Sequence, residues 1–131
     1  MPITLSTQQR TVPEKSTFRY TATIRDHTGE PIAAASLDTL TLTLYDKTTA
    51  GVIASVSGRD LLNANEGTVH ATSGLFTWIP LPAHNVLVDD TIANGKTETH
   101  IAEFEWTYDS SAKTGRHKLE FYVEQYAKVT S

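Results

Sequence analysis

Apolar and polar side chains alternate most regularly between residues 98 and 126. Over 98–108, Ala102, Phe104, Trp106 and Tyr108 alternate with glutamate and threonine. After a polar segment at 109–115, the segment 116–126 places Leu119, Phe121 and Val123 on one face and charged residues on the other. Such a two-residue period indicates half-buried antiparallel strands. We therefore predict a β-hairpin with arms at 98–108 and 116–126, joined by a loop at 109–115.

One pairing of these arms brings opposite charges together on the outer face. It sets Glu105 opposite Lys118, Thr107 opposite Arg116, Phe104 opposite Leu119 and Trp106 opposite His117. Outward pairs of this kind are worth only about 0.2–1 kcal/mol each. The buried face therefore sets the register in the main.

The same period recurs in the first half of the chain. Phe18, Tyr20, Ala22 and Ile24 share one face of a predicted strand at 18–24, and turn-forming residues follow at 26–31. Leu40, Leu42 and Leu44 alternate with threonine in a predicted strand at 37–45. A turn at 46–51 leads into a short apolar segment at 52–56, so residues 37–56 are predicted to form a second hairpin.

The pattern is weaker between residues 57 and 97. Residues 60–63 are compatible with a single helical turn, and residues 83–88 with a short helical turn or a strand. Strands are predicted at 68–71 and 75–79, and the second ends at Pro80 because proline cannot donate to a strand ladder. Asn94-Gly95 is a two-residue turn signal before the hairpin described first.

Seven to nine short strands with no long helix predict an all-β fold, either an antiparallel β-sandwich or a barrel. Regular two-residue faces on at least four strands favour two sheets packed face to face. A chain of 131 residues suits one domain with a sizeable core. We expect residues 1–15 to form an N-terminal extended segment or edge strand, and residues 16–131 to form the sandwich domain.

Composition and charge narrow the range of functions. With 39% hydrophobic and 20% charged residues the chain is globular, and its net charge of −4 argues against nucleic-acid binding. The absence of cysteine excludes disulfides, thiolate metal sites and a cysteine nucleophile, and favours folding in a reducing cytoplasm. We see no signal peptide, and the apolar segments are too short to span a bilayer, so no membrane contact is expected.

Candidate chemistry among the titratable residues is weak. The five histidines, His27, His70, His84, His100 and His117, stand apart in the sequence, so we predict turn or surface histidines and no metal site. Glu103 and Glu105 share a face, but neighbouring cations make them a charged sheet surface rather than an acid–base pair. Neither a nucleophile elbow nor a phosphate-binding glycine loop is present. The prediction is a protein with no catalytic residues, no cofactor and no enzymatic activity.

Several residues are candidates for contact with a partner. Trp78 and Trp106 fall on predicted inward faces, where core packing is expected, and this speaks against stacking of a glycan on them. The contact candidates are Ile3, Leu5, Arg10, His27, Tyr45, Tyr122 and Tyr126. They come from the N-terminal segment, from the loop at 26–31 and from outward positions on predicted strands. The loop at 109–115 is a further candidate contact region.

Some of these patterns resemble a known family. The segment 24–32, with Asp26, Gly29 and Pro31, resembles the D-x-x-G-x-P-[IV] opening of bacterial and phage immunoglobulin-like domains, and the strand at 40–45 follows it. Gly74-Leu-Phe76-Thr-Trp78 resembles their G-x-F-x-W strand. With the segments 102–106 and 115–119, the order over residues 16–126 is similar to small immunoglobulin-like proteins encoded among tailed-phage structural genes. The Cys…Trp…Cys framework of antibody domains is missing.

The resemblance implies an immunoglobulin-like, Greek-key sandwich that serves as a non-enzymatic virion protein. The implied role is capsid decoration, with the major capsid protein, another virion protein or a second copy of the chain as partner. A tail, neck or baseplate accessory protein is an alternative, and so is a carbohydrate-binding or adhesion module. Localisation to the virion, after synthesis in the host cytoplasm, is expected by analogy, because a fold by itself does not establish a function.

Overall fold

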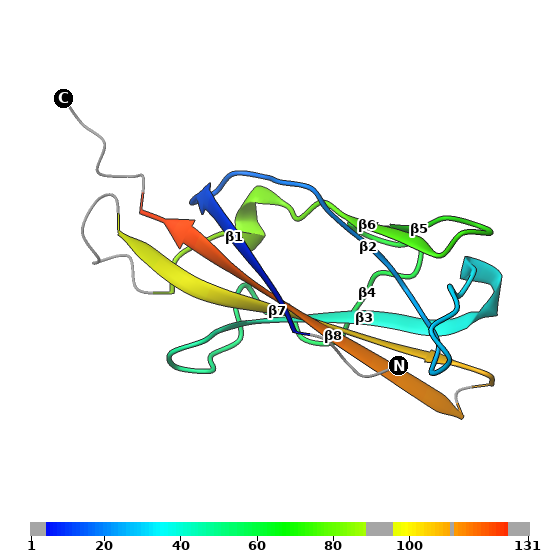
Figure 1. The fold of residues 1–131 in the computed structure, drawn as a ribbon. Helices are drawn as coiled ribbons and strands as arrows, with labels where there is room; N and C mark the ends of the chain where they lie inside the picture. Colours follow the sequence, from blue (N-terminus) through cyan, green and yellow to red (C-terminus); the bar gives the residue numbers. More distant parts are fainter. Residues whose placement is uncertain (1–4, 89–95, 111, 126–131) are drawn as a thin grey trace.

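The protein is an all-β sandwich, as the strand pattern predicts (Figure 1). The computed structural model describes residues 5–88, 96–110 and 112–125, with the side chains of residues 5–10 left out of that description. The larger sheet has the order β1 (Leu5–Pro13), β8 (Lys113–Glu124), β7 (Thr97–Tyr108), β3 (Leu37–Asp46) and β4 (Arg59–Asp60). The smaller sheet has the order β2 (Tyr20–Thr23), β6 (Leu75–Trp78) and β5 (Gly67–Val69). Two short 3₁₀ helices, η1 (Ala34–Ser36) and η2 (Pro82–His84), lie in the connections.

The core lies between the two sheets and is rich in aromatic rings. Trp78 from β6 is fully buried and meets Phe104 of β7 edge to face, with 5.4 Å between ring centroids. Phe18 and Phe121 pack against the same indole at 5.5 and 6.2 Å. Leu40, Leu42 and Leu44 of β3 are fully buried. The inward positions predicted for both tryptophans and for the leucines of β3 are therefore confirmed.

The predicted hairpin exists, but its register is wrong by two residues. Glu105 is opposite Arg116 and forms an ion pair with it at 2.6 Å, and Lys118 is opposite Glu103. In the same register Phe104 is opposite His117 and Trp106 is opposite Gly115. The cause is the turn, because β8 already begins at Lys113 and leaves only residues 109–112 to reverse the chain. A shift of two keeps every side chain on its predicted face.

The second predicted hairpin is also corrected. Residues 52–56 form no strand; an isolated bridge joins Val52 to Tyr45, and Ile53 and Val56 are buried under the end of β3. On the side of β3 away from β7, the strand that pairs with β3 is β4, which ends at Asp60, the first residue of the segment where the sequence suggested a helical turn. Ala54 and Ser55 have positive φ values of 52° and 61°, which an extended strand does not accommodate.

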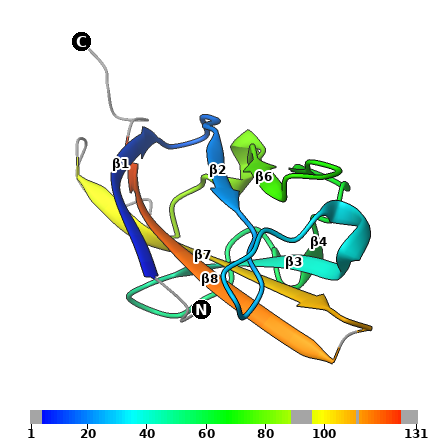
Figure 2. The ribbon, with the colours of Figure 1, turned by 45° about the vertical axis from the view of Figure 1, so that its right-hand side comes forward.

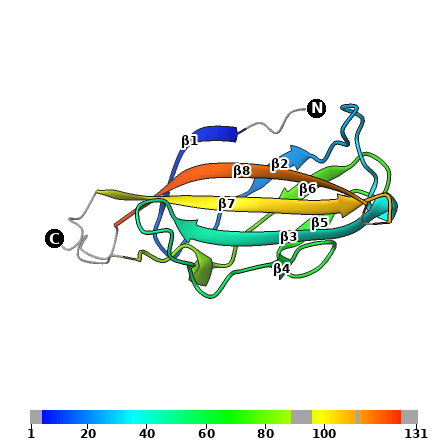
Figure 3. The same cartoon turned by 90° about the horizontal axis from the view of Figure 1, so that it is seen from below.

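The first described strand, β1, is an edge strand that runs parallel to β8, so the larger sheet is mixed and not purely antiparallel as predicted. Leu5 is opposite Lys118 and Pro13 is opposite Glu124, with an irregularity between Thr7 and Thr11. Figure 3 shows β1, β8, β7 and β3 side by side in that order. Val12 is buried and belongs to the core, so this part of the N-terminal segment is an integral strand of the larger sheet.

A bidentate ion pair lies under the connection between β4 and β5. Arg59 donates from Nε and Nη2 to the two carboxylate oxygens of Glu66 at 2.7 and 2.8 Å. The Glu66 side chain is only 7% exposed, and Nδ1 of the buried His84 lies 3.8 Å from its Oε1. The hydrogen bond from Arg59 lowers the pKa of Glu66, whereas burial lowers the pKa of His84 and the Glu66 carboxylate opposes that shift.

Acid should therefore destabilise the fold in a window set by His84. Because its folded-state pKa is lowered, the unfolded chain takes up a proton first as the pH falls below about 6.5, and the free energy of unfolding decreases. Urea unfolding at about pH 7.5 and at about pH 5.5 measures this loss in the free energy of unfolding. Both pH values lie above the range in which Glu66 titrates, so Glu66 does not contribute to the difference. We expect a smaller loss in His84→Gln than in the wild type. Equal losses in the two proteins would contradict the prediction.

Candidate functional site

A pocket of about 250 Å³ opens between the two sheets, at the end of the sandwich where β7 turns into β8. Its walls are largely aromatic. Tyr20 and Phe76 line it from the smaller sheet, and Phe104, Trp106 and Tyr108 line it from β7. The alternation along β7 explains this wall, since Phe104, Trp106 and Tyr108 are two residues apart and therefore lie on the same face of the strand.

Gly115 gives the Trp106 indole its position in this wall. The two residues are opposite each other on β7 and β8, and a Cβ at Gly115 would lie 2.5 Å from Nε1 of Trp106. Any larger residue would push the ring away. Nε1 is buried and has no hydrogen-bond partner. The hairpin therefore holds the indole flat against backbone and leaves one buried donor in the pocket region.

The turn at 26–31 lies beside the end of the hairpin (Figure 2). Its residues Asp26 and His27 line one side of the pocket. Oδ1 of Asp26 accepts hydrogen bonds from the backbone N–H of Thr28 and Glu30 and from the Thr28 hydroxyl, which lowers the pKa of Asp26. The backbone N–H of His27 donates to the Tyr108 hydroxyl at 3.0 Å, and the two rings stack at 6.3 Å. Two loops distant in sequence, the turn at 26–31 and the end of the hairpin, are thus joined at one end of the molecule.

Among the described residues that line the pocket, two arginines and one aspartate have charged side chains. They are Arg25, Arg116 and Asp26, and the histidines His27 and His117 line it as well. Arg116 donates a hydrogen bond from Nε to the carboxylate of Glu105, and Arg25 donates one to the backbone oxygen of Gly29. The Tyr20 hydroxyl and Nε2 of His117 are 2.6 Å apart. An apolar interior beside two guanidinium groups suits an apolar group that carries a carboxylate next to it.

The contact candidates whose side chains the structure describes, His27, Tyr45 and Tyr122, do not form one site. Of these, the exposed His27 lines the pocket. Tyr45 and Tyr122 are half-buried on the outer face of the larger sheet, and Leu5 and Arg10 lie on β1 with side chains outside the described part. Ile3 and Tyr126 fall outside the described residues. The two predicted contact loops, in contrast, both border the pocket.

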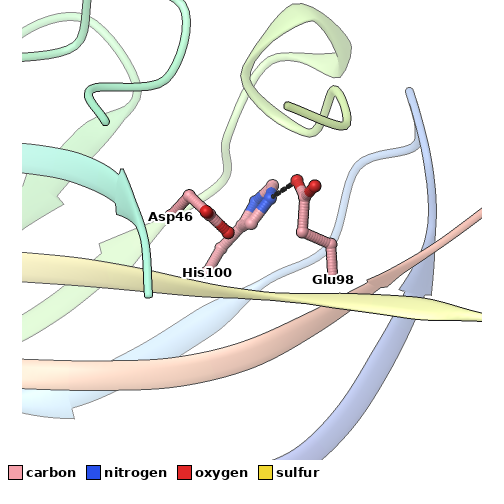
Figure 4. A group of neighbouring side chains, drawn as sticks. All are labelled: Asp46, Glu98 and His100. Carbon is pink, nitrogen blue, oxygen red and sulfur yellow. Dashed lines mark hydrogen bonds and ion pairs between the residues drawn. The ribbon is translucent and has the colours of Figure 1, made fainter. Parts of the chain in front are cut away.

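A second group of polar side chains lies away from the pocket, where β3 ends and β7 begins (Figure 4). It consists of Asp46, Glu98 and His100, and one ligand-capable atom from each lies within 4.8 Å of the other two. His100 is completely buried, and His84 is buried as well. The prediction of turn or surface histidines is wrong for His100, which lies on β7, whereas His84 lies in the helical turn η2 but is buried. Glu98 and His100 alternate on one strand, and that spacing was the available sequence signal for the group.

Comparisons with protein-family models, with curated proteins and with solved structures found no match for this chain. Within the described residues, none of the helices has the length and apolar character needed to cross a membrane.

Proposed function

We propose that this chain is a non-enzymatic structural protein of a tailed-phage particle, and that it docks on another virion protein through the aromatic pocket. The pocket is the main evidence for a docking site at this position. Its walls and both of the loops that border it lie at the same end of the sandwich. The resemblance of residues 16–126 to phage immunoglobulin-like proteins supports the phage assignment. Capsid decoration, with the major capsid protein as partner, is the role we favour.

The size of the pocket favours a partner side chain over a free ligand. Sites for small molecules commonly enclose about 300–1,000 Å³, and this pocket holds about 250 Å³. In protein–protein interfaces, a side chain buried in a well-packed pocket of the partner is often a hot spot that supplies much of the binding free energy. Arg25, together with Arg116 when it turns from Glu105 to the partner, would attract an acidic residue beside it. On a particle, the repeated lattice would multiply a modest affinity at each copy.

Filling the pocket tests the docking site. Ala22 of β2 is half-buried and lines the pocket. In Ala22→Leu, the longer side chain should occupy the space that the partner needs and reduce incorporation into particles by about tenfold or more. The melting temperature should stay the same or rise, because filling a cavity does not expose the core. Quantitative mass spectrometry of purified, salt-washed particles gives the copy number.

Ala83→Leu is the matched control, because Ala83 is exposed on η2 and does not line the pocket. Incorporation of Ala22→Leu at the level of this control would contradict the docking site. Copies on the order of hundreds per particle would indicate capsid decoration, and roughly a few to a few dozen would indicate the neck, tail or baseplate. Complete absence of the wild-type chain from particles would overturn the virion proposal itself.

A carbohydrate-binding module is the second candidate, and the position of Trp106 in the pocket wall favours it. Sugars stack on aromatic faces, and Trp106 and Tyr108 line the same pocket. Trp106 is only 9% exposed, which limits the face available for stacking. Titration with glycans should leave the tryptophan fluorescence unchanged if the protein-docking proposal is correct. A saturable change that Ala22→Leu abolishes would favour the glycan.

A further inference from the structure

We propose that Asp46, Glu98 and His100 form a binding site for a divalent transition-metal ion of the Zn²⁺ type. The site is independent of the aromatic pocket and of the proposed virion role, because it lies at another place in the sandwich and shares no residue with the pocket. Its supporting observations are the strand register, the burial of the side chains and two buried polar atoms without hydrogen-bond partners.

The register of the larger sheet brings the three residues together. Asp46 is the last residue of β3 and is directly opposite His100 on β7. Glu98 precedes His100 by two positions and therefore points to the same face of the sheet. Side chains opposite each other on neighbouring strands have Cβ atoms about 4.5–5.5 Å apart. Figure 4 shows the carboxylates of Asp46 and Glu98 on either side of the His100 imidazole.

Asp46 presents one carboxylate oxygen without a hydrogen bond. The residue is 2% exposed, and its Oδ2 accepts from the backbone N–H and the hydroxyl of Thr49 at 3.0 and 2.9 Å. Its Oδ1 is buried and has no hydrogen-bond partner. A buried carboxylate oxygen without a partner is unfavourable, and a bound cation would remove that penalty. Thr49 would then hold the ligating carboxylate in place, as outer hydrogen bonds do in metal sites.

Glu98 orients the imidazole of His100. Nε2 of His100 lies 2.6 Å from Oε1 of Glu98, within hydrogen-bond distance. This contact leaves Nδ1 as the ring atom available to a metal ion, and Nδ1 is buried without a hydrogen-bond partner. A histidine whose other nitrogen donates to a carboxylate is the usual arrangement around protein-bound metals. The backbone N–H of Val88 donates to the same oxygen of Glu98 at 2.7 Å and fixes its position.

The donor set selects the class of ion. An imidazole nitrogen beside carboxylate oxygens suits Zn²⁺ and its first-row neighbours, whereas Mg²⁺ and Ca²⁺ prefer sites made of oxygen alone. A divalent charge would also neutralise the two carboxylates of Asp46 and Glu98. We infer that the ion is held by Nδ1 of His100 and Oδ1 of Asp46, with Glu98 as orienting carboxylate and water in the remaining positions.

Zinc titration of the full chain, stripped of metal with a chelator, tests this site. Isothermal titration should give about one equivalent of Zn²⁺ per chain, and Zn²⁺ should raise the melting temperature. Ca²⁺ and Mg²⁺ should do neither. Asp46→Asn and His100→Gln should lower the Zn²⁺ affinity by more than about tenfold, and Glu98→Gln by about 10- to 100-fold.

His70→Gln is the matched control, because His70 is exposed and lies outside the group. It should bind Zn²⁺ like the wild type. A Co²⁺ absorption band from the wild type, displaced by Zn²⁺, gives a readout that does not depend on whether the variants fold. No stoichiometric binding by the wild type would overturn the proposal, as would unchanged affinity in folded Asp46→Asn and His100→Gln. An effect of His70→Gln equal to theirs would overturn it as well.

Discussion

Replacing Phe104 with alanine should lower the free energy of unfolding by about 4 kcal/mol. Phe104 is 1% exposed, and it lies between the sheets where Tyr20, Phe76 and Trp78 from the smaller sheet meet it at 5.1–5.9 Å. Alanine would remove the one ring that all three contact and leave a cavity that the rigid sheets cannot close. The melting temperature should fall by about 15 °C.

Tyr122→Ala is the control for this prediction. Tyr122 is an aromatic residue of β8 but is half-buried and faces away from the core. Its replacement should lower the free energy of unfolding by about 1 kcal/mol, the ordinary effect of a partly buried position. Chemical unfolding in guanidinium chloride measures both variants. A loss in Phe104→Ala no larger than that in Tyr122→Ala would show that the aromatic cluster is not the centre of the core.

Removing the Arg59 guanidinium should lower the free energy of unfolding by about 3 kcal/mol. The Glu66 carboxylate is almost completely buried and receives both of its short hydrogen bonds from Arg59. In Arg59→Ala the charge of Glu66 would remain buried without its main partner. Because the loss comes from that uncompensated charge, Arg59→Met combined with Glu66→Leu should restore most of the stability.

Lys47→Ala provides the comparison on the surface. Lys47 pairs with Glu120 at 3.1 Å, but its side chain is 57% exposed, so water and salt screen the interaction. We expect a change of about 0–1 kcal/mol. The buried charge of Glu66 would not be the source of the loss if Arg59→Ala is no more destabilising than Lys47→Ala. The same conclusion would follow if Arg59→Met with Glu66→Leu is less stable than Arg59→Ala. Equilibrium unfolding at neutral pH separates these outcomes.

The sequence predicted which residues face the core but not how the strands align. The two-residue period assigns Phe104, Trp106 and Leu119 to the buried face whatever the register, because a shift by two positions leaves the faces unchanged. The turn at 109–112 decides the alignment, through the positive φ of Asp109 and Ser110. A glycine in the sequence would have indicated a positive φ, but Asp109 and Ser110 do not.

The two candidate sites had only partial signals in the sequence, for a related reason. The pocket is lined by the turn at 26–31 and by Tyr108, which are joined by a hydrogen bond between residues far apart in the chain. Asp46 and His100 meet only because β3 and β7 pair in one particular register. Periodicity gives the direction of a side chain within its own strand. It does not give the neighbour across the sheet.

The parallel pairing of β1 with β8 sets the order in which this chain can complete its fold. β1 is made before every other described strand, and β8 is made after all of them. During synthesis the β1 segment must wait, unpaired, until β8 has left the ribosome. Contacts between distant parts of a chain slow folding, and the edge of β8 stays open to other chains until β1 arrives. Assembly of the larger sheet should therefore end at its β1 edge, and aggregation during expression should depend on how quickly that strand docks.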